Sequence, residues 1–208
     1  MQLVEQHVIS RSDPRFAAID AAAFAAKNLY NAANYLVRQA FILEHRYLDY
    51  AWVFHLVKHT DAYTALPRKV SNDILRQLDK NWRAFFAASE AYREDPSTFV
   101  GRPKLPKYKH KTKGRFLLIY DIQAISRPAL SRGRLRPSGL NIEVHTTHTA
   151  INQARIVPRS GYSVVELVYE HPEQPRQGTR ALHAARDRGV DTLAAIPSHK
   201  QGFRPPAY

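Results

Sequence analysis

Hydrophobic residues in the first part of the chain recur at alternating spacings of four and three positions. The first set is Ile19, Ala23, Ala26, Tyr30, Ala33, Val37 and Ala40. This spacing places them on one apolar stripe of an α-helix. Asp13 and Pro14 predict where the helix begins, with Asp13 as the N-cap and Pro14 at the first helical position. We expect the helix to end near Leu43. Its other face carries Lys27, Asn28, Asn31 and Arg38.

Two further helices are predicted before residue 101. One is expected over 48–59 and a longer one over 67–94, which ends before Pro96. The stripe of the longer helix is Val70, Ile74, Leu78, Trp82 and Phe85. Three amphipathic helices can hide their stripes by packing together, so the sequence predicts a helical bundle. Trp82 and Phe85 are interpreted as core residues of this bundle rather than as platforms for nucleobases.

Beyond residue 101 the hydrophobic pattern changes to the one expected of strands. Residues 116–120 form a short apolar run, and apolar and polar residues alternate over 140–145. The segments 154–158 and 162–170 flank a glycine-containing turn and predict a hairpin. With a strand expected at 2–9, these elements predict an α+β protein. In it, a small β-barrel or curled sheet is interrupted by the helical bundle.

Positive charge is concentrated between residues 101 and 140. This stretch holds eleven Lys or Arg residues and one acid, Asp121, so it carries +10 of the chain's formal net charge of +13. Its aromatic residues include Tyr108, Phe116 and Tyr120. Lys and Arg neutralise phosphates and release counterions, and aromatic rings stack on bases. A solvated linker is the alternative, but the position between helices and strands favours a nucleic-acid-binding surface.

Other classes of function have weaker signals. The chain has no cysteine, which excludes disulfides and thiolate zinc sites. No apolar run approaches the roughly 20 residues that span a bilayer, and the start of the chain does not resemble a signal peptide, so we expect a cytoplasmic protein. His55 and His59 have the spacing of zinc ligands on a helix, but no third ligand is evident. Surface histidines are the favoured interpretation there, and also for His145 and His148. The chain contains neither a nucleophile elbow nor a phosphate-binding glycine loop.

Six stretches of the chain, taken in order, resemble one known family. They read LVEQHVI with DPRF, KNLYNAANYLVRQAF, YTALPRKVSNDILRQLDKNWRAFF, GRPKLPKYKHKTKGR, IQAIS and QARIVPRSGYSVVELVYE. These stretches closely resemble successive blocks of TnpB, the transposon-encoded OrfB-type protein of the transposase class. The resemblance runs nearly end to end, from about Met1 to Pro205. It implies a relative of RNA-guided DNA endonucleases, which are similar to type V CRISPR effectors.

The resemblance also implies a domain plan. The family's N-terminal half is a wedge domain, an oligonucleotide-binding-type β-barrel, into which a helical recognition domain is inserted. Here it implies a wedge-like barrel from 1–13 and 102–171 and a recognition bundle over 14–101. A linker and a short RuvC-like (RNase H-like) fragment would occupy 172–208. The implied partners are a guide RNA and target double-stranded DNA, with no membrane, and a cytoplasmic location that becomes nucleoid-associated on DNA binding.

The family's nuclease begins with a strand like IDLGVNNLA followed by GFRP, which is similar to residues 186–194 and 202–205. Asp187 then falls on the first catalytic aspartate. Arg186 and Arg188 stand where the family has apolar residues, and burying unpaired guanidinium groups in a central strand is costly. The family's other catalytic acids and its zinc-finger cysteines have no counterpart in this chain. The sites for Mg²⁺ and Zn²⁺ are therefore incomplete, and we expect Asp187 to be a remnant in a chain that does not cleave by itself.

The cations of the basic segment and of the helices are the expected contacts to nucleic acid. In the basic segment they are Lys104, Lys107, Lys109, Lys111, Lys113 and Arg115, with Tyr108 as a stacking residue. On the helices they are Lys27, Arg38, Lys69, Arg76, Lys80 and Arg83, for which a solvated helix face is the alternative. Polar contacts, capping and surface roles are all open for Asn28, Asn31 and Asn34.

Alternative functions remain open at this level. The chain is a nucleic-acid-binding remnant, half of a split endonuclease completed by a separate RuvC polypeptide, or a decayed transposase-type gene product. A basic module that binds acidic protein or lipid is the alternative outside nucleic-acid binding.

Overall fold

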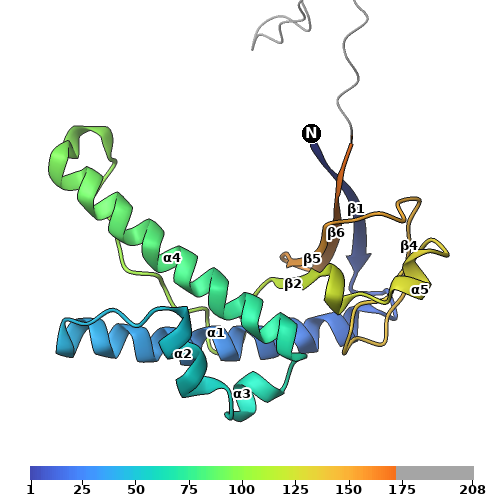
Figure 1. Ribbon diagram of the computed structural model, residues 1–208, viewed down its shortest axis with the longest axis horizontal. Coiled ribbons are helices and arrows are strands. Elements are labelled where there is room, and N and C mark those ends of the chain that lie inside the picture. The colour runs from blue at the N-terminus through green and yellow to red at the C-terminus, as the bar shows by residue number, and fades with distance from the viewer. Residues whose placement is uncertain (172–208) are drawn as a thin grey trace, which may run out of the picture. The chain divides into compact units, whose positions relative to one another are not determined.

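Two long helices and a four-stranded antiparallel sheet form the frame of the protein (Figure 1). The structure is a computed structural model that describes residues 1–171. It has the α+β composition that the sequence predicts. The long helices are α1 (Phe16–Glu44) and α4 (Arg68–Glu94), and the shorter helices between them are α2 (Tyr50–Val57) and α3 (Asp61–Thr64). The sequence analysis predicted α1, α2 and α4 and missed α3.

The sheet joins strands from the two ends of the described chain. Its order is β1-β6-β5-β2, and all neighbours are antiparallel. The strands are β1 (Gln2–Ser10), β2 (Leu118–Asp121), β5 (Gln153–Pro158) and β6 (Tyr162–Glu170). β1 pairs with β6 along its whole length, and β1 and β2 are the two edges of the sheet. The strand expected at 2–9 and the predicted hairpin are therefore confirmed.

A smaller β-ribbon and three short helices complete the architecture of residues 1–171. The ribbon pairs β3 (Arg134–Leu135) with β4 (Val144–His145). The short helices are α5 (Arg127–Leu130), η1 (Pro96–Thr98) and η2 (Ile122–Ala124). The strand expected over 140–145 is shorter than predicted, because its partner β3 has only two residues. Ile142 and Val144 are nevertheless buried, as the alternation predicts.

One apolar core runs from the helices into the sheet. The predicted stripe of α1 is buried along its length, from Ile19 to Ala40. Trp82 of α4 is fully buried and confirms its interpretation as a core residue, whereas Phe85 is only partly buried. Leu167 of β6 belongs to the same cluster as these helical residues. The long helices are thus fixed to the sheet through a shared interior. None of the helices in residues 1–171 is both long and apolar enough to cross a membrane.

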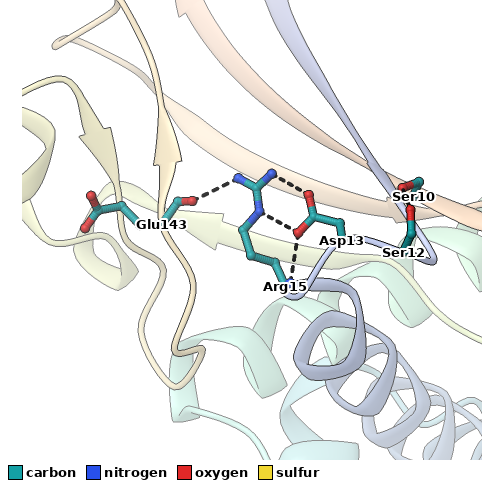
Figure 2. A network of polar contacts seen from close by, with 5 residues as sticks. All are labelled: Ser10, Ser12, Asp13, Arg15 and Glu143. Carbon is teal, nitrogen blue, oxygen red and sulfur yellow. Dashed lines mark hydrogen bonds and ion pairs between the residues drawn. The ribbon is translucent and has the colours of Figure 1, made fainter.

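The start of α1 differs from its prediction. The helix begins at Phe16, and Asp13 does not act as its N-cap. The Asp13 carboxylate instead accepts the backbone N–H of Arg15 at 2.9 Å and pairs with the Arg15 guanidinium, whose Nη2 lies 2.6 Å from Oδ2 (Figure 2). These contacts hold the pKa of Asp13 at about 2. Arg15 Nη1 also donates to the carbonyl of Glu143 at 3.0 Å, which ties α1 to the chain before β4.

Candidate nucleic-acid interface

The basic segment returns along α1 as an extended chain, and we call residues 102–115 the basic strap (Figure 1). Residues 102–110 form neither helix nor strand. Pro103 and Pro106 disfavour helix here, because proline lacks an N–H and restricts the residue before it. After the strap, the N–H of Phe116 donates to the carbonyl of Ala23 at 3.0 Å, and the chain enters β2.

A polar stripe on α1 binds the strap. Its members recur at spacings of four, three and four, immediately beside the buried apolar stripe: Lys27, Asn31, Asn34 and Arg38. Each one donates a hydrogen bond to a backbone carbonyl of the strap. Because later strap residues meet earlier helix residues, the strap runs antiparallel to α1. The helix therefore holds the strap mainly through the strap's backbone carbonyls.

Asn31 pairs with the strap as a neighbouring β-strand would. Its Nδ2 donates to the carbonyl of Lys109 at 2.8 Å, and its Oδ1 accepts the N–H of Lys109 at 2.9 Å. Both backbone groups of one strap residue are satisfied by one side-chain amide. This reciprocal pair fixes the position and the direction of the strap at Lys109.

Asn34 connects the strap to the core. Its side chain is fully buried, its Nδ2 donates to the carbonyl of Pro106 at 3.0 Å, and its Oδ1 accepts the indole N–H of Trp82 at 3.0 Å. Arg38 Nη1 donates to the same carbonyl at 3.1 Å. A buried amide whose oxygen and nitrogen are both hydrogen-bonded is a structural anchor. Asn34 is therefore a buried residue and does not have the surface role that the sequence left open.

Lys27 is buried, although the sequence placed it on a polar face. Its side chain is 2 % exposed, and Nζ donates to the carbonyl of Lys111 at 2.6 Å. Nζ also lies 3.7 Å from the centre of the Phe24 ring, an aromatic face that attracts a cation. Burial, and then the nearby charge of Arg115, lowers the pKa of Lys27. The structure therefore places the Lys27 ammonium group inside the protein, where it binds the backbone of the strap.

The C-terminal end of the strap is fixed by an ion pair and a tight turn. Arg115 binds Asp20 of α1 through two parallel contacts, at 2.7 and 2.6 Å, so its guanidinium group has an internal acidic partner. Before it, the N–H of Gly114 donates to the carbonyl of His110 at 3.0 Å. A Cβ at position 114 would lie 2.4 Å from that oxygen, so the turn requires glycine.

Five lysines of the strap remain exposed beside these anchors. The five are exposed, and within residues 1–171 none has an acidic group within ion-pair distance: Lys104, Lys107, Lys109, Lys111 and Lys113. Lys109 Nζ lies over the rings of Tyr30 and Phe116, at 5.7 and 5.5 Å. Tyr108 is also exposed, and its ring centre lies 5.2 Å from the guanidinium carbon of Arg38. The structure thus brings together five lysines and one exposed aromatic ring.

The predicted cations on α4 have a different setting. Arg76 pairs with Asp73 at 3.0 Å and Arg83 pairs with Asp79 at 2.6 Å, and both pairs lie within α4. Lys69 lies 3.9 Å from Asp121. Lys80 is exposed and, in the described part of the chain, has no contact of this kind. Of the four, only Lys80 resembles the strap lysines.

Asp20 was missed by the sequence analysis, although a signal for it exists. It lies seven residues before Lys27 and so extends the polar stripe of α1 by two turns. A stripe of polar residues beside an apolar one predicts a bound backbone segment as well as a solvated face.

Two other candidate sites complete the comparison with the predictions. Asp187 and the arginines beside it lie outside the described residues. Among residues 1–171, no three His, Asp or Glu side chains gather as a metal site would require, and this includes the region of His55 and His59.

No model of a known protein family matches this sequence, and no curated protein matches it significantly.

Proposed function

We propose that this chain is a nucleic-acid-binding protein of the TnpB type and that its basic strap binds the phosphate backbone of a structured guide RNA. One observation carries the proposal: five lysines are exposed, lack acidic partners in the described residues, and project from a chain that α1 fixes by its backbone. Internal salt bridges use up cations, whereas these remain available to a polyanion.

The anchored strap provides a preorganised row of charges. Its backbone is already ordered, so binding does not have to meet the entropic cost of ordering a disordered arm. Lysines are point charges on flexible stems and contact phosphates without selecting a base. Recognition of an RNA helix by shape and backbone contacts fits this chemistry. Tyr108 adds a face on which an unpaired base stacks.

The proposal extends to the rest of the family plan. The open sheet and the β3–β4 ribbon would be parts of a wedge-like barrel, and target double-stranded DNA would be a second partner. Sequence choice in such a system comes from base pairing. We propose that residues 1–208 taken alone bind nucleic acid without cleaving it, because the stretch that resembles a nuclease offers only two acids, Asp187 and Asp191. Two-metal cleavage needs several converging carboxylates. Magnesium-dependent cleavage by the purified chain would contradict that part.

The salt dependence of RNA binding tests the central claim. For the full chain with a labelled structured RNA, about six phosphate contacts give a slope of log K against log salt near −4 to −5. Replacing the five strap lysines with Gln is expected to remove about 3.5 to 4.5 from that slope's magnitude. An unchanged slope would place the interface elsewhere, and no binding of the wild-type chain at low salt would overturn the proposal.

A further inference from the structure

Three arginines outside the strap line one surface depression. They are Arg132, Arg134 and Arg136, which we call the arginine cluster. All three are exposed, and the single acid in the depression is Glu143. The cluster therefore keeps an excess of two positive charges in a small area. It belongs to the same basic stretch of sequence as the strap but lies outside residues 102–115.

The local backbone explains why the arginines converge. Leu135 of β3 is fully buried, whereas the residues on either side of it, Arg134 of β3 and Arg136 after the strand, are exposed. Gly133 has a φ of +71°, and a Cβ there would lie 2.9 Å from the carbonyl of Thr146. The tight turn at Gly133 brings Arg132 to the same depression as Arg134 and Arg136.

Glu143 holds the cluster in place. Its Oε1 lies 3.2 Å from Nη1 of Arg134, and its Oε2 lies 3.6 Å from Nε of Arg136. The backbone of Glu143 is fixed in turn, because its carbonyl accepts Nη1 of Arg15, which is itself bound by Asp13 (Figure 2). The two arginines are thus oriented before any ligand arrives, and most of their N–H donors have no partner within residues 1–171.

The chemistry of the cluster differs from that of the strap. A guanidinium group presents a planar fork that binds a phosphate through two parallel hydrogen bonds, whereas a lysine offers a point charge. The cluster lies on the segment that contains α5, β3 and β4, whereas the strap lies along α1 (Figure 1). Within residues 1–171, no hydrogen bond or ion pair joins the cluster to the strap.

We propose that the arginine cluster is a second phosphate-binding surface, which binds the phosphodiester backbone of a nucleic acid independently of the strap. This inference rests on the proposed function and deepens it by giving the protein two separate contacts. The phosphates come either from a distant part of the RNA on the strap or from a separate DNA duplex. The shared chemistry is the phosphodiester group.

The test uses the full chain and two probes, a labelled structured RNA and a labelled 30-base-pair DNA duplex. One variant replaces Arg132, Arg134 and Arg136 with Gln. A matched control replaces three exposed arginines elsewhere with Gln: Arg11, Arg68 and Arg159. A further variant replaces the cluster with lysines, which keeps the charge and removes the fork. Circular dichroism shows whether each variant is folded.

We expect the glutamine variant to lower the salt slope by about 2 to 3 for one probe, since each lost phosphate contact removes about 0.7 to 0.9. The control should change it by less than about 1. The lysine variant should keep the slope but bind about tenfold more weakly, and it remains informative if the glutamine variant does not fold. A loss on the RNA probe assigns the phosphates to the same RNA. A loss on the duplex alone, with duplex still bound at saturating RNA, assigns them to DNA.

The outcomes separate the two proposals. If the cluster variant matches the control on both probes while the strap variant loses RNA binding, the second surface does not exist and the proposed function stands. If the wild-type chain binds neither probe at low salt, both proposals fail.

Discussion

The strap lysines and the helical cations carry the same charge, and most of both groups are exposed, yet the molecule uses them differently. Five strap lysines have no acidic partner in residues 1–171. On the helices, Arg76 and Arg83 pair with carboxylates, and Lys27 donates to the strap itself. We therefore call the strap lysines free cations, and we call the cations that have internal partners, such as Lys27, Arg76 and Arg83, committed cations.

This difference shows that the number of cations is a poor guide to a binding surface. On α4, acids three and four residues before the arginines place opposite charges on one helix face. The strap contains no acid at all, so its lysines have no carboxylate partner close to them in the sequence. What distinguishes a cation available to a polyanion is the absence of an internal partner.

The largest effect is expected where the two groups meet, at Asn34. The substitution Asn34→Leu removes the partner of the buried Trp82 indole N–H and one of two donors to the carbonyl of Pro106. An unpaired buried donor costs about 1–3 kcal/mol, so we expect the free energy of unfolding to fall by about 2 kcal/mol. Urea denaturation measures this change.

The matched control is Asn28→Leu, which alters an exposed asparagine on the same helix and should shift stability by less than about 0.5 kcal/mol. Tryptic cleavage after the strap lysines should also be faster in Asn34→Leu than in the control, because the strap loses an anchor. Equal stability and equal cleavage in the two variants would mean that Asn34 does not hold the strap.

Committed cations should also respond to acid in a way that free ones do not. The pKa of Asp13 is lowered from 3.8 to about 2 by Arg15, so its ionised form stabilises the folded state. That contribution is present above pH 3.8 and is lost as the pH falls towards 2. We expect Asp13→Asn to cost about 1 kcal/mol at pH 6, an amount reduced by the partial exposure of Arg15, and almost nothing at pH 2.

Urea denaturation at the two pH values measures this gap. Lys107→Met is the comparison, because in residues 1–171 its charge has no carboxylate partner whose protonation would matter. If the deficit of Asp13→Asn persists unchanged at pH 2, the ion pair is not its source.

The helices and strands could be predicted from the spacing of apolar residues, because the residues that are buried in the fold are the ones that produce this spacing. The stripe of α1, the stripe of α4 and the hairpin of β5 and β6 each bury the residues that the spacing selects. The predicted start of α1 was wrong, because the Asp13 carboxylate binds the guanidinium group of Arg15 and does not cap the helix. The spacing of residues in the sequence does not show which of two nearby partners a carboxylate binds.

The sequence allowed the exposed residues of the candidate site to be predicted, but not the internal contacts that hold the strap. The strap lysines are exposed where the charge run indicated. Lys27 and Arg115 were assigned to the same surface, but both make internal contacts with partners 84 and 95 residues away. A contact of that range leaves no local pattern. The regular spacing of the polar stripe on α1 was visible, yet a solvated face and a face covered by backbone have the same spacing.

The smallest expected effect is on the salt dependence of RNA binding, and it distinguishes most directly between free and committed cations. Lys27→Met and Lys107→Met each remove one positive charge, so their long-range electrostatic effects are matched. Lys107 is exposed, and its loss should lower the magnitude of the RNA salt slope by about 0.7 to 0.9. Lys27 is 2 % exposed and bound to the strap's backbone, so its loss should lower the slope by less than about 0.3, while methionine fills its apolar surroundings. Fluorescence anisotropy over a salt series measures both. An equal fall in the two slopes would mean that the buried ammonium reaches a phosphate, and the division between free and committed cations would be wrong.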